Sequence, residues 1–362
     1  MGCSYNSENT NIFSMPKPIA KNDNAPVTEI TFALTSSLAG NMDAEKEFYE
    51  RNQGVFINVG GCEYLKKYLW ALKQGLGDSL VLSHVGSVLS KDGKNNLSTV
   101  SCLSKIGYDF IAPSAYDVVN RKNLEDERLT KNFIVNNFLD LQTGKALNNH
   151  PFTSTMLLEK NGINVGVISI FDPELTQGQI SANYINGVYI EDMVATILKE
   201  KNDLRNKGAN IIVLALQNLS NCEGNVKSLE GAKAEQLICR FSDPLKSVLK
   251  KIPGGTIDII LSASPLMGNG FLAEVPVLQN IGKSKFISLA KLYFDTKEKK
   301  LLKNRSLVLP PLKVCHQYFE KTQDCYMKTT NEFKFTNTRK DLIGGDPNLV
   351  TPSVLGISLD QF

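Results

Sequence analysis

The sequence predicts a layered α/β fold, and three observations lead to that prediction. Short, nearly continuous apolar runs alternate with helical patterns along most of the 362 residues. Turns rich in Gly, Asn and Asp separate these segments, and strand–helix alternation of this kind is typical of stacked layers of sheets and helices. The composition, 42% apolar and 21% charged, is that of an ordinary globular protein. The length is ample for a sizeable core, either in one large α/β domain or in two domains.

The apolar runs mark the expected strands. Each run is apolar almost throughout, which is typical of strands that are covered on both faces. We predict strands at residues 30–35, 79–85, 110–113, 163–171, 210–216 and 257–263. Residues 286–302 predict two further strands joined by a charged turn, which would form a hairpin at the edge of a sheet.

Two stretches between these runs predict helices. In residues 60–74 the apolar positions recur at helical spacing, at Tyr64, Leu65, Tyr68, Leu69 and Leu72. Residues 191–208 also have a helical pattern, and they end at Gly208, a residue suited to the position just after a helix.

Composition divides the chain into three regions. Residues 1–26 are dominated by Asn, Ser, Lys and Pro, so we expect a flexible N-terminal tether. Residues 27–309 carry the alternating pattern and form the expected domain. Residues 310–362 lack strong periodicity, and we expect them to form an extension that packs on the domain or on a partner.

The charge and the cysteine content exclude several classes of protein. The 40 basic and 37 acidic residues give a net charge of +3, spread along the chain, which is too mild for a nucleic-acid partner. No apolar run is long enough to span a bilayer as a helix. The seven cysteines show no spacing typical of zinc or attached haem, so we expect no cofactor. Apart from Cys3, they are compatible with disulfides in an oxidising compartment or with buried free thiols.

Several segments, taken in order, resemble the N-terminal catalytic domain of the 5′-nucleotidase branch of the calcineurin-like metallophosphoesterases. They are residues 30–41, Gly60-Gly61 with the following helix, 106–110, 137–145 with 151–152, 165–169, 207–214 and 277–280. The resemblance covers roughly residues 27–305. It implies a four-layer fold, a β-sandwich flanked by helices, with two metal ions at the carboxyl ends of the strands. The chain ends about 55 residues after this region, so we expect no separate nucleotide-recognition domain.

The resemblance also implies where the metal ligands of the family would fall. The Asp-x-His motif aligns with Ser37 and Ala39, and the Gly-Asn-His-Glu motif aligns with Ala115 and Tyr116. The metal-bridging Asp falls on Gly86, or on Ser87 after a one-residue shift. The remaining two motifs place their ligands at Gln217, Ser264 and Leu266. Neutral or apolar side chains cannot hold two adjacent divalent cations, which need anionic ligands.

Three hypotheses for the function follow. The first is a catalytically inactive protein that keeps the metallophosphoesterase scaffold for binding or assembly, without metal. The second is a hydrolase with a rebuilt site, for which His84 and Asp117 are the candidates because they fall near strand ends. The third is a small-molecule sensor that uses the old substrate cleft. Of the chain's three histidines, His84 is the one that lies within one residue of a family motif.

The N-terminus suggests a lipid anchor. Cys3 after Gly2 fits a lipoprotein whose mature chain begins near this point, which would place the protein at the cell envelope or in the periplasm. Alternatively, Gly2 carries a myristoyl group and Cys3 a palmitoyl group on the cytosolic face of a membrane, although Asn6 replaces the Ser or Thr of that consensus. An unmodified tail is the third alternative. We also expect a protein partner. Cys315, His316 and Cys325 in the extension fit a disulfide or packed thiols better than a haem or metal site.

Overall fold

The structure is a computed structural model that describes most of the chain between residues 26 and 318. The described ranges are 26–50, 55–124, 132–147, 151–172, 184–185, 187–217, 243–265, 268–309, 311–318 and 337–338. The N-terminal tether with Gly2 and Cys3 lies outside them, as do Leu266, His150 and Cys325. No helix in the described part is long and apolar enough to cross a membrane.

The larger sheet has a parallel centre and an antiparallel neighbour on one side. Its order is β18 (Lys300–Leu301), β17 (Phe286–Asp295), β1 (Val27–Ser36), β4 (Leu80–Gly86), β5 (Phe110–Pro113), β6 (Phe133–Ile134) and β8 (Phe152–Thr153). Strands β1, β4, β5, β6 and β8 run parallel, and β17 pairs with β1 in the antiparallel sense. Two short strands, β19 (Leu307–Val308) and β20 (Leu312–Lys313), also pair with β17. The described start of the C-terminal region therefore continues along this sheet.

The second sheet repeats the parallel arrangement. Its order is β15 (Gly268–Leu272), β16 (Val275–Asn280), β14 (Ile259–Ala263), β13 (Ile211–Gln217), β10 (Ile163–Ile170) and β9 (Met156–Lys160). The inner strands β16, β14, β13 and β10 are parallel, and the edge strands β15 and β9 are antiparallel to their neighbours. Because β1, β4, β13 and β14 are central, their side chains are covered on both faces, which explains their continuous apolar runs.

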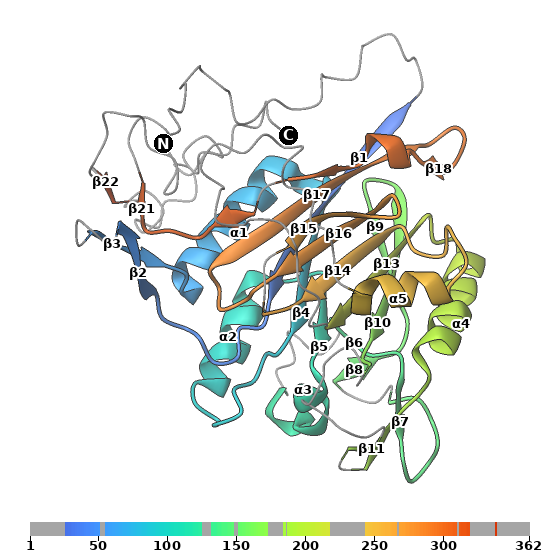
Figure 1. Ribbon diagram of the computed structural model, residues 1–362, viewed down its shortest axis with the longest axis horizontal. Helices are drawn as coiled ribbons and strands as arrows, with labels where there is room; N and C mark the ends of the chain where they lie inside the picture. The colour runs from blue at the N-terminus through green and yellow to red at the C-terminus, as the bar shows by residue number, and fades with distance from the viewer. Residues whose placement is uncertain are drawn as a thin grey trace, which may run out of the picture.

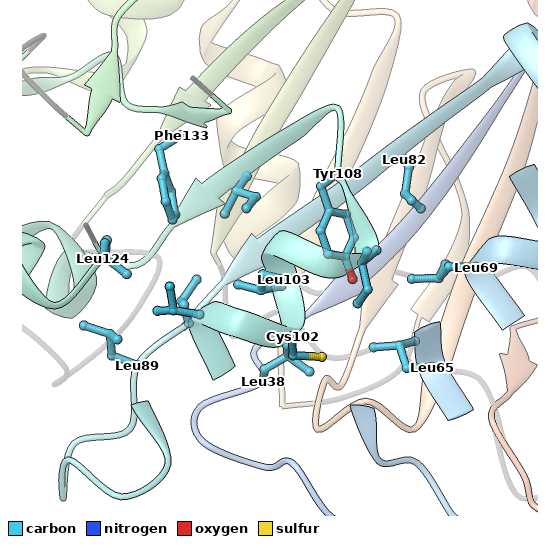
Figure 2. Packing of buried hydrophobic residues seen from close by; sticks show 14 of the residues in the cluster. Leu38, Leu65, Leu69, Leu82, Leu89, Cys102, Leu103, Tyr108, Leu124 and Phe133 are labelled. Carbon is cyan, nitrogen blue, oxygen red and sulfur yellow. The ribbon is translucent and has the colours of Figure 1, made fainter. Parts of the chain in front are cut away.

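Helices cover the outer face of each sheet, so the molecule has four layers (Figure 1). Helices α1 (Cys62–Leu76) and α2 (Asn96–Ile106) lie on the larger sheet, and α4 (Met193–Asn206) and α5 (Asp243–Lys251) lie on the second. Three hydrophobic clusters fill the spaces between the layers. One lies under α1 and α2, one lies between the sheets, and one lies under α4 and α5. Figure 2 shows part of the first cluster, with Cys102 and Leu103 of α2 near Leu65 of α1.

Smaller elements complete the described chain. Helix α3 (Ala115–Val119) follows β5, and short 3₁₀ turns lie at Gly77–Ser79, Arg121–Leu124 and Lys303–Arg305. Three small sheets are formed by β11 (Tyr184–Ile185), β12 (Val188–Ile190) and β7 (Phe138–Asp140), by β2 (Glu45–Glu50) and β3 (Val55–Val59), and by β21 (Gln317–Tyr318) and β22 (Asn337–Thr338).

The predicted layered α/β fold is confirmed, including the sandwich of sheets between helices. Every predicted strand and both predicted helices are present, and Gly208 follows the end of α4 with φ at 91°. The hairpin after residue 286 is β17 and β18, and β18 is at the sheet edge. The β2–β3 hairpin, α2 and α5 are not marked in the sequence by the patterns used for these predictions. Helix α2 is rich in Ser and Thr, which are indifferent helix formers, and its helical state is stabilised by the burial of Val100, Cys102 and Leu103.

Candidate functional site

The motif positions of four central strands converge at one end of the sandwich. Ser37 follows β1, Gly86 ends β4, Gln217 ends β13, and Ser264 follows β14. A Cβ atom built on Gly86 would clash with Ser37 Oγ, and it would lie 2.7 Å from Ala263 Cβ and 3.1 Å from Gln217 Nε2. Real Cβ atoms essentially never come within 3.0 Å of another heavy atom. Side chains from both sheets therefore occupy the space beside Gly86, and Gly86 is the residue that permits this close approach.

The backbone holds the first and second motif loops together. The amide of Ser37 donates to the carbonyl of Val85 (3.1 Å), and the amide of Ala39 donates to the carbonyl of Ser87 (3.0 Å). Ser37 and Ala39 have positive φ values of 35° and 45°, a region that L-residues with side chains rarely adopt. These contacts hold the two residues in a strained conformation that packing on both sides sustains.

The third motif position has become the beginning of helix α3. Ser114 caps the helix in a capping box with Asp117, which accepts hydrogen bonds from the Ser114 amide and hydroxyl. Asp117 also accepts the amides of Val88 (3.0 Å) and Leu89 (2.8 Å) from the second motif loop. Burial raises the pKa of Asp117 to about 6 although these bonds favour its charged form. The carboxylate thus joins two loops and caps a helix.

The motif residues Ala115 and Tyr116 occupy the first turn of α3. Ala115 is buried, and the Tyr116 hydroxyl donates to the carbonyl of Lys91 at 3.4 Å. Ser264 is nearly buried at the end of β14, where its amide donates to the carbonyl of Asn280. Of the predicted motif positions, Leu266 lies outside the described residues.

His84 faces the helix-side core instead of the converging motif residues. Its Nδ1 lies 3.0 Å from Thr35 Oγ1, and Thr35 Oγ1 lies 2.7 Å from the hydroxyl of Tyr108. His84 is fully buried, and burial alone lowers its pKa to about 3, so the imidazole is neutral at physiological pH. Its Nε2 is buried and has no hydrogen-bond partner among the described residues.

The two candidates for a rebuilt site are therefore in separate environments. The hydrogen bonds of Asp117 go to the loop after β4 and to Ser114, while those of His84 go to Thr35. In the described part of the chain, no hydrogen bond or ion pair joins His84 to Asp117. A general acid and base must both reach the same substrate, and two fully buried side chains with separate partners do not meet this condition.

The groups that converge at the strand ends do not fit a pair of divalent cations. Ser37 contributes a hydroxyl, Gln217 an amide, and Gly86 and Ala263 no polar side-chain atom. Within the described ranges, no group of three or more His, Cys, Asp or Glu residues is placed to hold a metal ion. Adjacent divalent ions repel each other and need anionic oxygen or imidazole ligands, which the described donor set lacks.

Comparison with known proteins identifies the fold. No family model and no curated protein sequence matches the chain. Among solved structures it is similar to a 5′-nucleotidase precursor from Thermus thermophilus, with a TM-score of 0.58, 16% identity, and coverage of 80% of this chain and 55% of that one. It is also similar to the NAD nucleotidase of Haemophilus influenzae (TM-score 0.54, 12% identity, coverage 80% and 57%).

A third similar structure has nearly the same extent as this chain. It is a calcineurin-like phosphoesterase from Bacillus subtilis, with a TM-score of 0.55, 14% identity, and coverage of 88% of this chain and 96% of that one. The chain spans a little over half the length of the two nucleotidases. These similarities show that the chain has the fold of the calcineurin-like metallophosphoesterases, as the resemblance in its sequence implies.

Proposed function

We propose that this chain is a metallophosphoesterase-like protein without catalytic activity, which serves as a binding or assembly module. The observation that carries the proposal is the close packing around Gly86. In a two-metal site, the ions need open space lined by charged ligands. Here Ser37, Gln217 and Ala263 approach the position that a side chain on Gly86 would need.

The loss of charge supports the same conclusion. The metal-motif positions that the structure describes hold Ser, Ala, Gly, Tyr and Gln, and the nearby carboxylate of Asp117 is engaged by four hydrogen bonds. His84 is neutral and faces a different core. The scaffold is retained while neutral side chains stand at the positions of the metal ligands, as expected of a protein that acts by binding through its surface.

Metal analysis and hydrolysis assays test this proposal. The full chain is purified after exposure to Mn²⁺, Zn²⁺ and Fe²⁺, and bound metal is measured by elemental analysis. Hydrolysis of nucleotides and of a generic phosphodiester is measured in parallel, with the Bacillus subtilis phosphoesterase as the positive control. We expect substoichiometric metal and no turnover above background. Two equivalents of metal together with turnover would establish the alternative, a hydrolase with a rebuilt site.

A sensor that binds a neutral ligand is the second candidate, and one observation favours it. The Oε1 atom of Gln217 is buried at the strand ends and has no hydrogen-bond partner in the described ranges. A buried acceptor of this kind costs free energy unless a donor satisfies it. A thermal-shift screen with nucleosides and sugars tests the idea, because a ligand that binds the native state raises the melting temperature. A hit that is lost in Gln217→Leu would support a sensor, and no stabilisation by any compound would exclude these ligand classes.

We further propose that the protein works at a membrane of the cell envelope, held by an acyl chain on Cys3. Cys62 and Cys102 form a disulfide, a bond that persists mainly in oxidising compartments such as the periplasm. Mass spectrometry of the N-terminal peptide from the native host detects an acyl group on Cys3 or on Gly2. Cys3→Ser is the matched control and should move the protein from the membrane fraction to the soluble one. An unmodified peptide would refute the anchor.

A protein partner is the remaining part of the proposal. A scaffold without chemistry acts through what it contacts, so we expect a stable complex in native membranes. Chemical crosslinking followed by affinity purification of the anchored protein identifies the partner. The Cys3→Ser variant shows whether the complex depends on the anchor. Recovery of the chain alone in both cases would contradict an assembly role.

A further inference from the structure

A pocket of about 570 Å³ lies beside the beginning of α1 and along α2. Its lining residues come from the loop before β2, from the first turn of α1, from α2 and from His316, and they include both half-cystines of the Cys62–Cys102 disulfide. None of the converging motif positions lines this pocket. The pocket is therefore a separate feature from the strand-end site, and the Cys62–Cys102 disulfide lies in its wall.

The two sulfur atoms of this disulfide have different surroundings. Cys62 is the first residue of α1, a 15-residue helix whose N-cap, Gly61, provides no side-chain cap. Cys102 lies in the interior of α2 and is 2% exposed, against 8% for Cys62, and Figure 2 shows it among core residues. The amide of Cys62 itself donates to the carbonyl of Met42 at 2.9 Å. The dipole at a helix N-terminus stabilises a thiolate there, whereas an apolar core raises the pKa of a thiol.

The charged groups around the pocket do not cancel the difference in thiol pKa expected between Cys62 and Cys102. Asp43 and Glu63 are the acidic lining residues, and Glu63 is neutralised by an ion pair with Lys66 at 2.9 Å. Lys105 is the basic one. His316 stacks on Tyr64, with ring centroids 3.3 Å apart, and burial lowers its pKa, so it is neutral at pH 7. The local charge is nearly balanced, so the N-terminus of α1 is the main electrostatic difference between the surroundings of Cys62 and Cys102.

We infer that Cys62–Cys102 is an exchange-active disulfide that a dithiol reaches through this pocket, with Cys62 as the exchanging sulfur and Cys102 as the buried resolving sulfur. The inference rests on the position of one sulfur at a helix start and the other in the core, with an open pocket against both. It goes beyond the proposed binding function and does not depend on it.

The exchange is balanced without any further reactant. The thiolate of a reduced dithiol attacks Cys62 Sγ, forms a mixed disulfide and releases the Cys102 thiolate, which takes up a proton. The second thiol of the dithiol, as a thiolate, attacks the dithiol's first sulfur in the mixed disulfide and expels Cys62 as a thiolate, which takes up the second proton. The dithiol leaves as a disulfide, having supplied two electrons and two protons, and the protein carries two thiols. The reverse sequence oxidises the pair.

Selective reduction of the native full-length protein tests the inference. The protein is titrated with dithiothreitol, and in a second arm with a reduced CxxC dithiol protein, then alkylated and mapped by mass spectrometry. Cys315, which is also disulfide-bonded but does not line the pocket, is the internal control. We expect Cys62 and Cys102 to be alkylated at a dithiothreitol dose at least tenfold below that for Cys315. Reduction by the dithiol protein as well would identify a protein reductant, and reduction by dithiothreitol alone would identify a small one. Reduction of Cys62 and Cys102 at the same dose as Cys315, or at a higher one, would overturn the inference.

Two single-cysteine variants separate the roles of the sulfurs. In Cys102→Ser, the Cys62 thiol should be alkylated with an apparent pKa below about 7.5, in the range of thiols at helix starts. It should also form a mixed disulfide with an added aromatic disulfide within minutes. In the matched variant Cys62→Ser, the Cys102 thiol should react at least tenfold more slowly. Equal rates in the two variants, or an ordinary pKa near 8.5 for Cys62, would refute the assignment, and the titration of the wild-type protein does not depend on how either variant folds.

Discussion

Replacement of Gly86 by alanine tests whether the strand-end site is closed by packing. Gly86 has a φ of 99°, and the added Cβ would clash with Ser37 Oγ and lie 2.7 Å from Ala263 Cβ. Two costs therefore add together. A residue with a Cβ in the left-handed region costs roughly 1–2 kcal/mol, and an overpacked core costs roughly 1–3 kcal/mol. We expect Gly86→Ala to lower the free energy of unfolding by about 2–5 kcal/mol.

Gly93→Ala is the matched control for this substitution. Gly93 has a φ of 74°, and a Cβ atom there would meet no atom of the described residues within 4 Å. It should show the backbone cost alone, roughly 1–2 kcal/mol. The difference between the two variants measures the packing term, which we expect to be about 1–3 kcal/mol. Urea denaturation followed by far-UV circular dichroism gives both free energies, and equal slopes show that the denatured states are comparable.

A double-mutant cycle of Ser37→Ala with Gly86→Ala tests whether the clash with Ser37 Oγ causes the packing cost. Ser37→Ala removes the hydroxyl that Cβ would meet first, so Gly86→Ala should be less costly in that background.

Gly86→Asp provides the chemical counterpart, because it restores a carboxylate at the metal-bridging position. We expect it to be more destabilising than Gly86→Ala, and we expect Mn²⁺ not to raise its melting temperature. Equal costs for Gly86→Ala and Gly93→Ala, or strong stabilisation of Gly86→Asp by Mn²⁺, would show that the site is open and refute the reasoning.

Three further perturbations have definite expected outcomes. The folded-state pKa of His84 is depressed to about 3 from 6.5, so the free energy of unfolding falls as the pH drops below 6.5. Between pH 7 and pH 5 this loss is about 2 kcal/mol. His84→Gln should abolish this part of the pH dependence in urea titrations. Asp117 changes stability in the opposite direction, because its folded-state pKa is raised from 3.8 to about 6. Acidification from pH 7 to pH 5 should therefore raise its contribution to the free energy of unfolding by about 1 kcal/mol. Asp117→Asn removes this contribution, so its free energy of unfolding should fall more steeply with acidification than that of the wild-type protein, as urea titrations would show. Cys62→Ser should destabilise the protein by up to about 4 kcal/mol in calorimetry, since the Cys62–Cys102 bond closes a loop of 40 residues. No change is expected relative to wild-type protein in which the Cys62–Cys102 bond alone has been reduced.

Much of the fold can be predicted from the sequence because the central strands are covered on both faces. Strands β4, β13 and β14 are buried along nearly their whole length, and β1 is buried from Ile30 onward, so each contains an apolar run that marks it. Strand β2 has no such run, because its sequence is EKEFYE, and its Glu45 and Glu47 form ion pairs with Lys285, next to β17. A strand fixed by charges from a distant part of the chain has no apolar run to mark it.

The candidate site also has features that the sequence shows and features that it does not. The loss of charged side chains at the motif positions can be seen in the sequence, since it depends only on which residues follow each strand. The contacts of His84 and Asp117 cannot be seen in the sequence, because each depends on the direction in which its side chain points from the sheet or loop. Both residues fall near strand ends, yet His84 packs against Tyr108 in the helix-side core and Asp117 binds the loop after β4.

The sequence by itself determined the order of the central strands and of helices α1 and α4, and the chemical groups available at the strand ends. These properties follow from apolar periodicity and residue identity, which are local. The tertiary structure decided that Ser37, Gly86 and Gln217 meet without room for a further side chain, and that Cys62 pairs with Cys102 across the α1–α2 interface. Such distances arise from the packing of segments far apart in the chain, and no local pattern encodes them, because even a complete set of cysteine positions leaves their pairing open.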